Sequence, residues 1–214
     1  MNQALHICSY LKHHINSHLF FDPNYVIWNN ADFHEYDWTD FYHEAKEAIP
    51  PNAPEPRGHA VQINAFVDAD HAGNRITRRS HTGILIYLNH APITWYSKAQ
   101  NTVESSTFGS EFIAMRILVD MLESLRYKLR MLGIPIDGAA NVFCDNNSVV
   151  INSIVPTSTL KKKHNSIAYH RVREAVAAGI LRIAKVISSE NLADLLTKCL
   201  PGPTLRNLVQ KILW

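Results

Sequence analysis

The stretch INAFVDADHAGN, residues 63–74, decides how this chain folds. In its first half, Ile63, Ala65 and Val67 alternate with other side chains, which predicts a β-strand. Two acids, Asp68 and Asp70, then close the strand. Because Asp and Gly favour turns, this stretch alone is compatible with a plain turn and also with a polar site at the end of the strand.

The composition describes a globular protein without a disulfide framework. Of the 214 residues, 46% are hydrophobic and 19% are charged, which is enough apolar material for one sizeable domain with an appendage, or for two small domains. The net charge of +2 is too small to indicate a nucleic-acid partner, so any basic patch must be local. Cys8, Cys144 and Cys199 are widely spaced, which favours a reducing compartment.

Nothing in the sequence predicts a membrane span, a signal peptide or a zinc site. No apolar run approaches the roughly 18 residues of a membrane helix. Lys12, His13 and His14 interrupt the apolar stretch at the amino terminus, unlike a signal peptide. His13, His14 and His18 crowd the amino terminus, but no cysteine pair at zinc-finger spacing accompanies them. We therefore expect a soluble intracellular protein.

The first sixty residues differ in composition from the rest. Residues 2–15 carry apolar side chains at helical spacing, and residues 32–44 are acidic and aromatic without a clear period. Four prolines in residues 48–60 predict an extended linker. We therefore divide the chain into an N-terminal connection segment, residues 1–60, and a domain, residues 61–214.

Residues 61–214 predict a mixed order of strands and helices. We expect five strands, at residues 61–68, 82–88, 93–97, 141–145 and 180–187. We expect helices from the caps Ser105, Ser106 and Thr107 to Gly133, over 146–154 and 164–178, and from about Asn191. Three strands before the first helix do not follow a strictly alternating order, so a mixed α/β sheet flanked by helices is predicted.

Four carboxylates fall beside the predicted core. Asp68 ends the first strand, and Asp145 ends the fourth and stands at the cap of the following helix. Glu111 borders the buried face of the long helix near its start, and Asp194 lies in the first turn of the last helix. An unpaired carboxylate next to the core is costly, so these positions require an explanation.

A shared divalent metal site explains all four acids together. Mg²⁺ takes a few protein carboxylates and keeps water and substrate phosphate as its other ligands. Two such ions about 3.5–4 Å apart can promote phosphodiester cleavage. Taken singly, Asp145 and Asp194 also suit plain helix N-termini, and Glu111 suits a solvated helix surface.

The order of elements and acids resembles ribonuclease H, and more closely the ribonuclease H region of copia-type (Pseudoviridae) retrotransposon polyproteins. The blocks that carry this resemblance are DADHAG (68–73), RRSHTG (78–83), WYSKAQNTVESSTFGSEF (95–112), CDNNS (144–148), KHNSIAYHRVRE (163–174) and NLADLLTK (191–198). They cover about residues 61–200 in order. The first part, ALHICSYLKHHINSHLFFDP, is similar to the tail of the preceding reverse transcriptase.

The resemblance implies a ribonuclease H-like fold, a five-stranded mixed sheet with helices on both faces. It implies a metal-dependent endonuclease that hydrolyses the RNA strand of RNA·DNA hybrids during reverse transcription. The catalytic quartet then falls on Asp68, Glu111, Asp145 and Asp194, which would hold two Mg²⁺ ions, with Mn²⁺ as a substitute. Asp70 becomes a loop residue or a helper at the rim. Phe108 departs from the polar or acidic residue common in the family, but it lies outside the quartet.

The resemblance also implies partners and a location. An RNA·DNA hybrid needs contacts to its phosphates, mostly from Lys and Arg. The candidates for nucleic-acid binding are Arg75, Arg78, Arg79, Ser97, Asn146, Lys161, Lys162 and Lys163, and the charge runs also suit plain solvated surface. His164 and His170 are candidates for assisting product release. A covalently linked reverse transcriptase is expected, in cytoplasmic virus-like particles or the nucleus, and not in a secreted form.

Two rival functions stay open at this point. One is a catalytically inactive retroelement remnant, or a module that only binds hybrid. The other is an integrase-type transesterase acting on DNA, a class that generally uses three acids. Because all four acids of the quartet are present, the sequence argues against a remnant that has lost its catalytic residues. The blocks RRSHTG and YHRVRE favour ribonuclease H over the integrase type.

Overall fold

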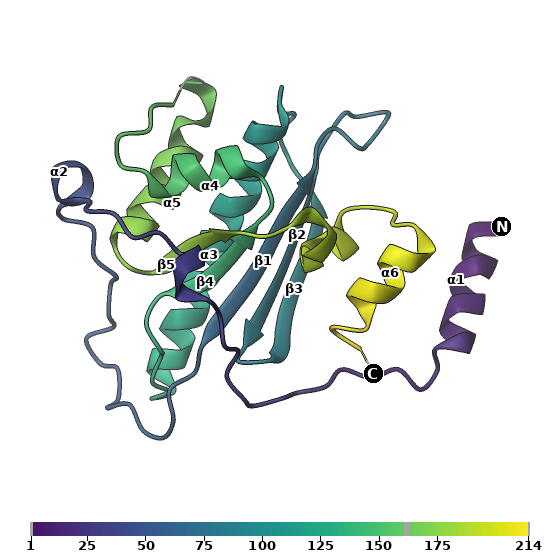
Figure 1. Ribbon diagram of the computed structural model, residues 1–214, viewed down its shortest axis with the longest axis horizontal. Helices are drawn as coiled ribbons and strands as arrows, with labels where there is room; N and C mark the ends of the chain where they lie inside the picture. Colours follow the sequence, from purple (N-terminus) through teal and green to yellow (C-terminus); the bar gives the residue numbers. More distant parts are fainter. Residues whose placement is uncertain (1, 161–162, 214) are drawn as a thin grey trace.

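The structure is a computed structural model that describes residues 2–160 and 163–213, and its centre is a mixed sheet (Figure 1). Within these residues, five strands pair in the order β3-β2-β1-β4-β5. β1 pairs antiparallel with β2, which pairs antiparallel with β3, whereas β4 and β5 run parallel to β1. The strands are β1 (Ile63–Asp70), β2 (His81–Leu88), β3 (Ala91–Ala99), β4 (Ala140–Cys144) and β5 (Leu181–Lys185). The prediction of a mixed five-stranded α/β fold is confirmed.

The helices follow the caps that the sequence offers. The longest helix begins after Ser106, whose hydroxyl accepts a hydrogen bond from the backbone N–H of Gly109 at 3.2 Å. It ends where Gly133 adopts a φ of +69°, a left-handed conformation that favours glycine. The α-helices are α1 (Asn2–His13), α2 (Thr39–Tyr42), α3 (Thr107–Met131), α4 (Asn147–Ile154), α5 (Ser166–Ala177) and α6 (Gly202–Val209).

Short 3₁₀ helices connect these elements. They are η1 (Asn30–Asp32), η2 (Lys163–Asn165), η3 (Ser188–Glu190) and η4 (Leu192–Leu196). Among the described residues, no helix is long and apolar enough to cross a membrane.

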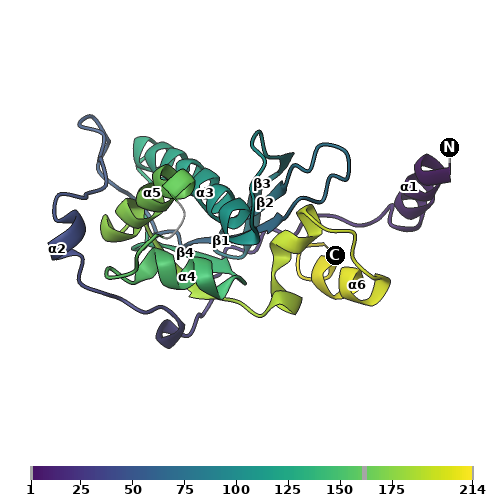
Figure 2. The ribbon, with the colours of Figure 1, turned by 90° about the horizontal axis from the view of Figure 1, so that it is seen from above.

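Each face of the sheet carries its own apolar core. On one face, Ile63, Ala65 and Val67 of β1 pack with residues of α3, α4 and α5. On the other face, Phe66 of β1 packs with Phe143 of β4 and with residues of η4 and α6. Seen from above, α3 and α5 lie together and α6 lies well apart from them (Figure 2). The alternation of β1 therefore builds helices onto both faces, as predicted.

Part of the N-terminal segment packs against the domain. Phe33 is buried in the smaller core, and the ring of Trp28 lies 4.4 Å from that of Phe143. Glu47 accepts hydrogen bonds from the guanidinium of Arg126 at 2.7 and 2.8 Å and also pairs with Arg130, both on α3. In contrast, the apolar side chains of α1 are exposed. Side chains between residues 28 and 47 therefore pack against the domain, across the boundary that the sequence placed at residue 60.

We predict that residues 61–214 fold alone but unfold at a lower temperature than the whole chain. The sheet and its larger core stay intact in this fragment, whereas Phe143 loses Trp28 and Phe33, and the buried Arg126 loses its carboxylate partner. Leaving a buried charge without its partner is strongly destabilising.

Circular dichroism melts of the whole chain, residues 17–214 and residues 61–214 test the division. Removal of residues 1–16 is the control, because the described side chains from residue 4 to residue 16 are all exposed. An unfolded 61–214 fragment would show that the N-terminal segment belongs to the folding unit.

Candidate active site

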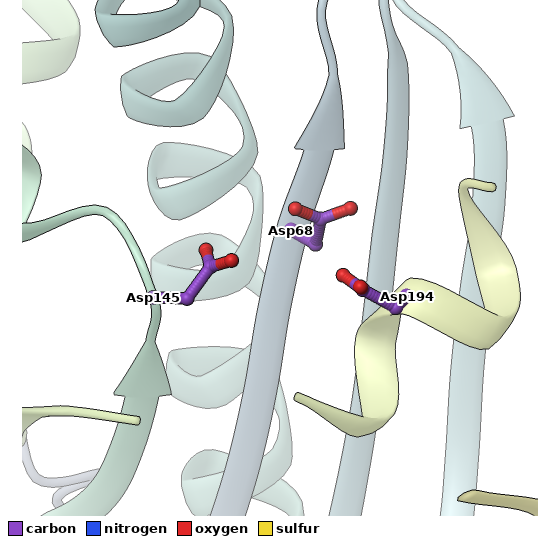
Figure 3. A group of neighbouring side chains, drawn as sticks. All are labelled: Asp68, Asp145 and Asp194. Atoms are coloured by element: carbon purple, nitrogen blue, oxygen red, sulfur yellow. The ribbon is translucent and has the colours of Figure 1, made fainter. Parts of the chain in front are cut away.

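Three carboxylates meet at one end of the sheet (Figure 3). Asp68 lies on β1, and Asp145 directly follows β4, which is the parallel neighbour of β1 with Val67 opposite Cys144. Asp194 reaches them from η4. Among the described residues, Asp68, Asp145 and Asp194 each offer one carboxylate oxygen, and these oxygens lie within 4.8 Å of one another. Such a set of oxygen ligands suits a divalent cation.

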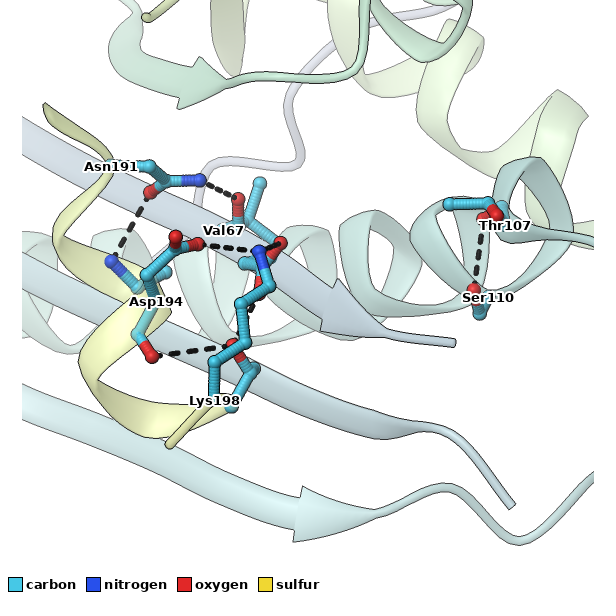
Figure 4. Close-up of polar contacts among 9 residues, drawn as sticks. Val67, Thr107, Ser110, Asn191, Asp194 and Lys198 are labelled. Carbon is cyan, nitrogen blue, oxygen red and sulfur yellow. Dashed lines mark hydrogen bonds and ion pairs between the residues drawn. The ribbon is translucent and has the colours of Figure 1, made fainter. Parts of the chain in front are cut away.

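Asn191 fixes the helix that carries Asp194. Its side chain is fully buried and donates a hydrogen bond from Nδ2 to the carbonyl of Val67 at 3.0 Å (Figure 4). Its Oδ1 accepts a hydrogen bond from the N–H of Ala193 at 3.1 Å and so caps η4. Because Val67 immediately precedes Asp68, this one amide side chain ties the start of η4 to the strand that carries the first acid.

The structure corrects two local predictions near these acids. The predicted terminal helix from Asn191 is instead the short η4, followed by a separate α6. The N–H groups of Thr197 and Lys198 bond to the carbonyl of Asp194, and Pro201 then has no N–H with which to continue a helix. The cap of α4 is Asn146 and not Asp145, because Asn146 Oδ1 accepts from the N–H groups of residues 148 and 149.

Gly83 on β2 leaves room for η4 beside Asp68. It is the strand partner of Asp68, and a Cβ built on it would lie 2.6 Å from Thr197 Cγ2 and 2.8 Å from the carbonyl oxygen of Ala193. Both distances are shorter than normal contacts, so only glycine allows η4 to approach the sheet this closely. The glycine of the RRSHTG block therefore acts through packing rather than through an unusual φ.

We predict that Gly83→Val destabilises the protein by about 1–3 kcal/mol, the usual cost of overpacking, and weakens divalent-ion binding at least tenfold. The added side chain must push η4, and Asp194 with it, away from Asp68. Urea unfolding and calorimetric titration with MnCl₂ measure the two effects. Gly202→Ala is the control, because a Cβ there meets no atom within 4 Å. Unchanged metal affinity in Gly83→Val would show that the position of η4 does not matter for the site.

Glu111 approaches the same acids from the helix layer on the other face. Its side chain is only 4% exposed, and its Oε2 has no hydrogen-bond partner among the described residues. Burial, and then the charges of Asp68 and Asp145, raise the pKa of Glu111 to about 9. Glu111 is not one of the three acids whose carboxylate oxygens lie within 4.8 Å of one another. A buried oxygen without a partner beside three carboxylates fits a cation ligand.

Two residues that sequence analysis did not single out hold the acids. Lys198 Nζ donates to Asp194 Oδ1 at 2.8 Å (Figure 4). It also donates to Asp68 Oδ1 at 3.1 Å, and Thr197 Oγ1 donates to Asp68 Oδ2. Burial alone would lower the pKa of Lys198, but the hydrogen bond to Asp194 and the charge of Asp68 raise it. Burial raises the pKa of Asp194. The sequence feature that could have indicated the contact of Lys198 with Asp194 is their i,i+4 spacing.

Asp70 stands apart from the converging acids. A Cβ built on Gly73 would lie 1.6 Å from Asp70 Oδ2, so the carboxylate of Asp70 lies against the loop that follows β1. Asp68, and not Asp70, is therefore the acid of the opening pair that joins the cluster. Both interpretations of the opening stretch apply, because the strand ends in an acid site and in a glycine-containing turn.

The predicted nucleic-acid contacts occupy several places. Arg75, Arg78 and Arg79 are exposed on the loop 71–80, which extends beyond the strand ends in Figure 1. Lys163 is exposed, while Lys161 and Lys162 lie outside the described residues. The Ser97 hydroxyl donates to the carbonyl of Leu196, and Asn146 caps α4, so both side chains already have partners. His170 shares a hydrogen bond with the hydroxyl of Tyr42, and the side chain of His164 is not among those that the structure describes.

Comparison with solved structures agrees with the fold. The structure described as LC11-RNase H1 in complex with an RNA/DNA hybrid aligns with a TM-score of 0.51 and 16% identity, over 64% of this chain and 94% of that one. Together with the strand order and the helices on both faces, this places the chain among proteins with the ribonuclease H-like α/β fold.

Sequence comparison identifies the relatives. The chain is 32% identical over 156 residues to the retrovirus-related Pol polyprotein from transposon RE1 of Arabidopsis thaliana, which covers 73% of this chain and 11% of that protein. It is 34% identical over 139 residues to the corresponding polyprotein from transposon TNT 1-94 of Nicotiana tabacum. This match covers 65% of this chain and 10% of that polyprotein. No protein-family model matches the sequence. The chain is homologous to a region of the Pol polyproteins of copia-type transposons and spans about a tenth of their length.

Proposed function

We propose that this protein is a metal-dependent ribonuclease H that hydrolyses the RNA strand of RNA·DNA hybrids during retroelement reverse transcription. The observation that carries the proposal is the convergence of Asp68, Asp145 and Asp194 on a ribonuclease H-like sheet. The homology to Pol polyproteins supports the same assignment. Hydrolysis adds water across the scissile phosphodiester and leaves 5′-phosphate and 3′-hydroxyl ends.

The four acids would hold the metal. Asp68, Asp145 and Asp194 each offer an oxygen at the same place, and Glu111 offers a buried oxygen that lacks a partner among the described residues. The chemistry that two bound Mg²⁺ ions supply is activation of a water and stabilisation of the leaving 3′-oxygen, with Mn²⁺ as a substitute. All-oxygen ligation by carboxylates favours these hard cations over zinc.

The remaining residues of the site would position these acids and bind the substrate. Thr197 holds one oxygen of Asp68, and Asn191 holds η4 against β1. The exposed arginines of the loop 71–80, with Lys163, would contact phosphates, since backbone contacts supply most of the affinity for nucleic acid. Ser97, Asn146, Lys161 and Lys162 would add further contacts to the nucleic-acid backbone.

We also propose the setting in which the enzyme works. The relatives are polyproteins about ten times longer than the matched region, which supports a reverse transcriptase covalently linked to this domain. Such a protein would act in cytoplasmic virus-like particles or in the nucleus, where reverse transcripts are made or delivered, and would not be secreted.

A panel of substrates separates this function from its rivals. The purified chain is incubated with end-labelled RNA·DNA hybrid and with duplex DNA, each with MgCl₂ and then with excess EDTA. Cleavage of the hybrid alone, stopped by EDTA, supports ribonuclease H. Binding of the hybrid without cleavage would favour an inactive or binding module, and cleavage of duplex DNA without cleavage of the hybrid would favour an integrase-type enzyme.

A further inference from the structure

Lys198 shares the carboxylate oxygens that a metal ion would need. Both oxygens of Asp68 have donors, because Thr197 Oγ1 donates to Oδ2 and Lys198 Nζ donates to Oδ1. The same ammonium group also reaches Asp194 Oδ1 at 2.8 Å. Lys198 therefore bridges two of the three acids that converge, and it does so from the residue four positions after Asp194.

The burial of Asp68 and Lys198 indicates which of the two side chains can move away when a metal ion binds. Asp68 is only 1% exposed and is held within β1, so its carboxylate cannot turn away from the site. The Lys198 side chain is 36% exposed and has a flexible stem, so its ammonium group can reach solvent. A divalent ion that binds Asp68 Oδ1 and Asp194 Oδ1 must take the place of this ammonium group.

We propose that Lys198 is an internal counter-ion that neutralises Asp68 and Asp194 in the metal-free protein and competes with a divalent ion for them. This inference rests on the proposed function, because it assumes that these acids hold metal. The charges favour it, since buried acids that face one another without a cation repel. Lys198 thereby keeps the site assembled before metal binds and limits how tightly metal binds.

The competition is measured by calorimetric titration of the whole chain with MnCl₂ and by thermal melts in EDTA. Lys198→Gln is expected to bind Mn²⁺ at least fivefold more tightly than the wild type, because no ammonium group has to be displaced. In EDTA its melting temperature is expected to fall by about 3 °C or more, because the two acids lose their cation. Lys198→Arg keeps the positive charge and is expected to stay within about twofold of wild-type affinity.

Lys185→Gln is the matched control for charge. Lys185 is exposed at the end of β5, opposite Cys144, so this variant removes a positive charge near the site without removing a described contact to the acids. Equal or weaker Mn²⁺ binding by Lys198→Gln, or the same gain in Lys185→Gln, would overturn the role of Lys198 while leaving the nuclease proposal intact. A wild-type protein that binds no Mn²⁺ would overturn the proposed metal site and this inference together.

Discussion

Asp145→Asn is expected to lower the rate of hybrid cleavage by at least about a thousandfold. The substitution is nearly isosteric and removes one of the three carboxylates that converge at the strand ends. The transition state of phosphodiester hydrolysis depends on the cations that these acids hold, so losing one ligand charge acts on the chemical step. Binding of the hybrid should persist, because phosphate contacts by Lys and Arg do not involve Asp145.

Stability in EDTA separates a catalytic from a structural role of Asp145. Without metal, removing one of several neighbouring negative charges relieves repulsion, so the variant should melt at the same or a higher temperature than the wild type. Mg²⁺ should raise the wild-type melting temperature through linkage and raise that of the variant much less. Asp137→Asn, an exposed site preceding β4, is the control. A variant that unfolds in EDTA, or that still cuts hybrid, would contradict the assignment.

Glu111→Gln is expected to stabilise the metal-free protein increasingly as the pH rises from 5 to 9. Burial, followed by the charges of Asp68 and Asp145, raises the pKa of Glu111 to about 9 in the folded protein. The unfolded carboxyl ionises near the usual value of about 4.3, so between these values folding requires proton uptake, which becomes less favourable as the pH rises. Glutamine removes this penalty. By pH 8 the gain should exceed about 1.4 kcal/mol, the equivalent of one pKa unit.

Urea unfolding in EDTA across this pH range measures the gain. Glu174→Gln on α5 is the control, because it removes an exposed carboxylate from a helix that carries none of the four acids. A constant difference between Glu111→Gln and the wild type at all pH values would show that Glu111 is not a buried acid of raised pKa. Excess Mg²⁺ should reverse the order of stability, because the ionised Glu111 then serves as a ligand.

The regular elements could be predicted because their signals are local. The alternation in β1 and the cap at Ser106 depend on residues that are neighbours in the chain. In the structure, Ile63, Ala65 and Val67 face one core and Phe66 the other, and Ser106 caps α3. The same patterns placed Asp68 near the end of β1 and Asp145 at the end of β4, although β1 continues to Asp70 and β4 ends one residue before Asp145. Parallel pairing then brings these two acids to one edge of the sheet.

The features that sequence analysis missed depend on contacts between distant residues. η4 is short and stays against the sheet because Gly83 leaves room for it and Asn191 bonds to Val67. In the sequence, Lys198 resembles an ordinary solvated lysine, and only the packing of η4 against the sheet brings its side chain to Asp68 on β1. Trp28 and Phe33 show no period in the sequence, because an irregular segment carries them to Phe143. Only the folded arrangement reveals these contacts.

The most direct test of the central claim is the fate of one RNA strand, labelled at its 5′ end and annealed to DNA. With MgCl₂, the account predicts cuts in the RNA strand alone, products with 3′-hydroxyl and 5′-phosphate ends, and complete arrest by EDTA. The same strand annealed to complementary RNA should stay intact. Cleavage that continues in EDTA, or products with 2′,3′-cyclic phosphate ends, would contradict a metal-dependent ribonuclease H built on Asp68, Glu111, Asp145 and Asp194.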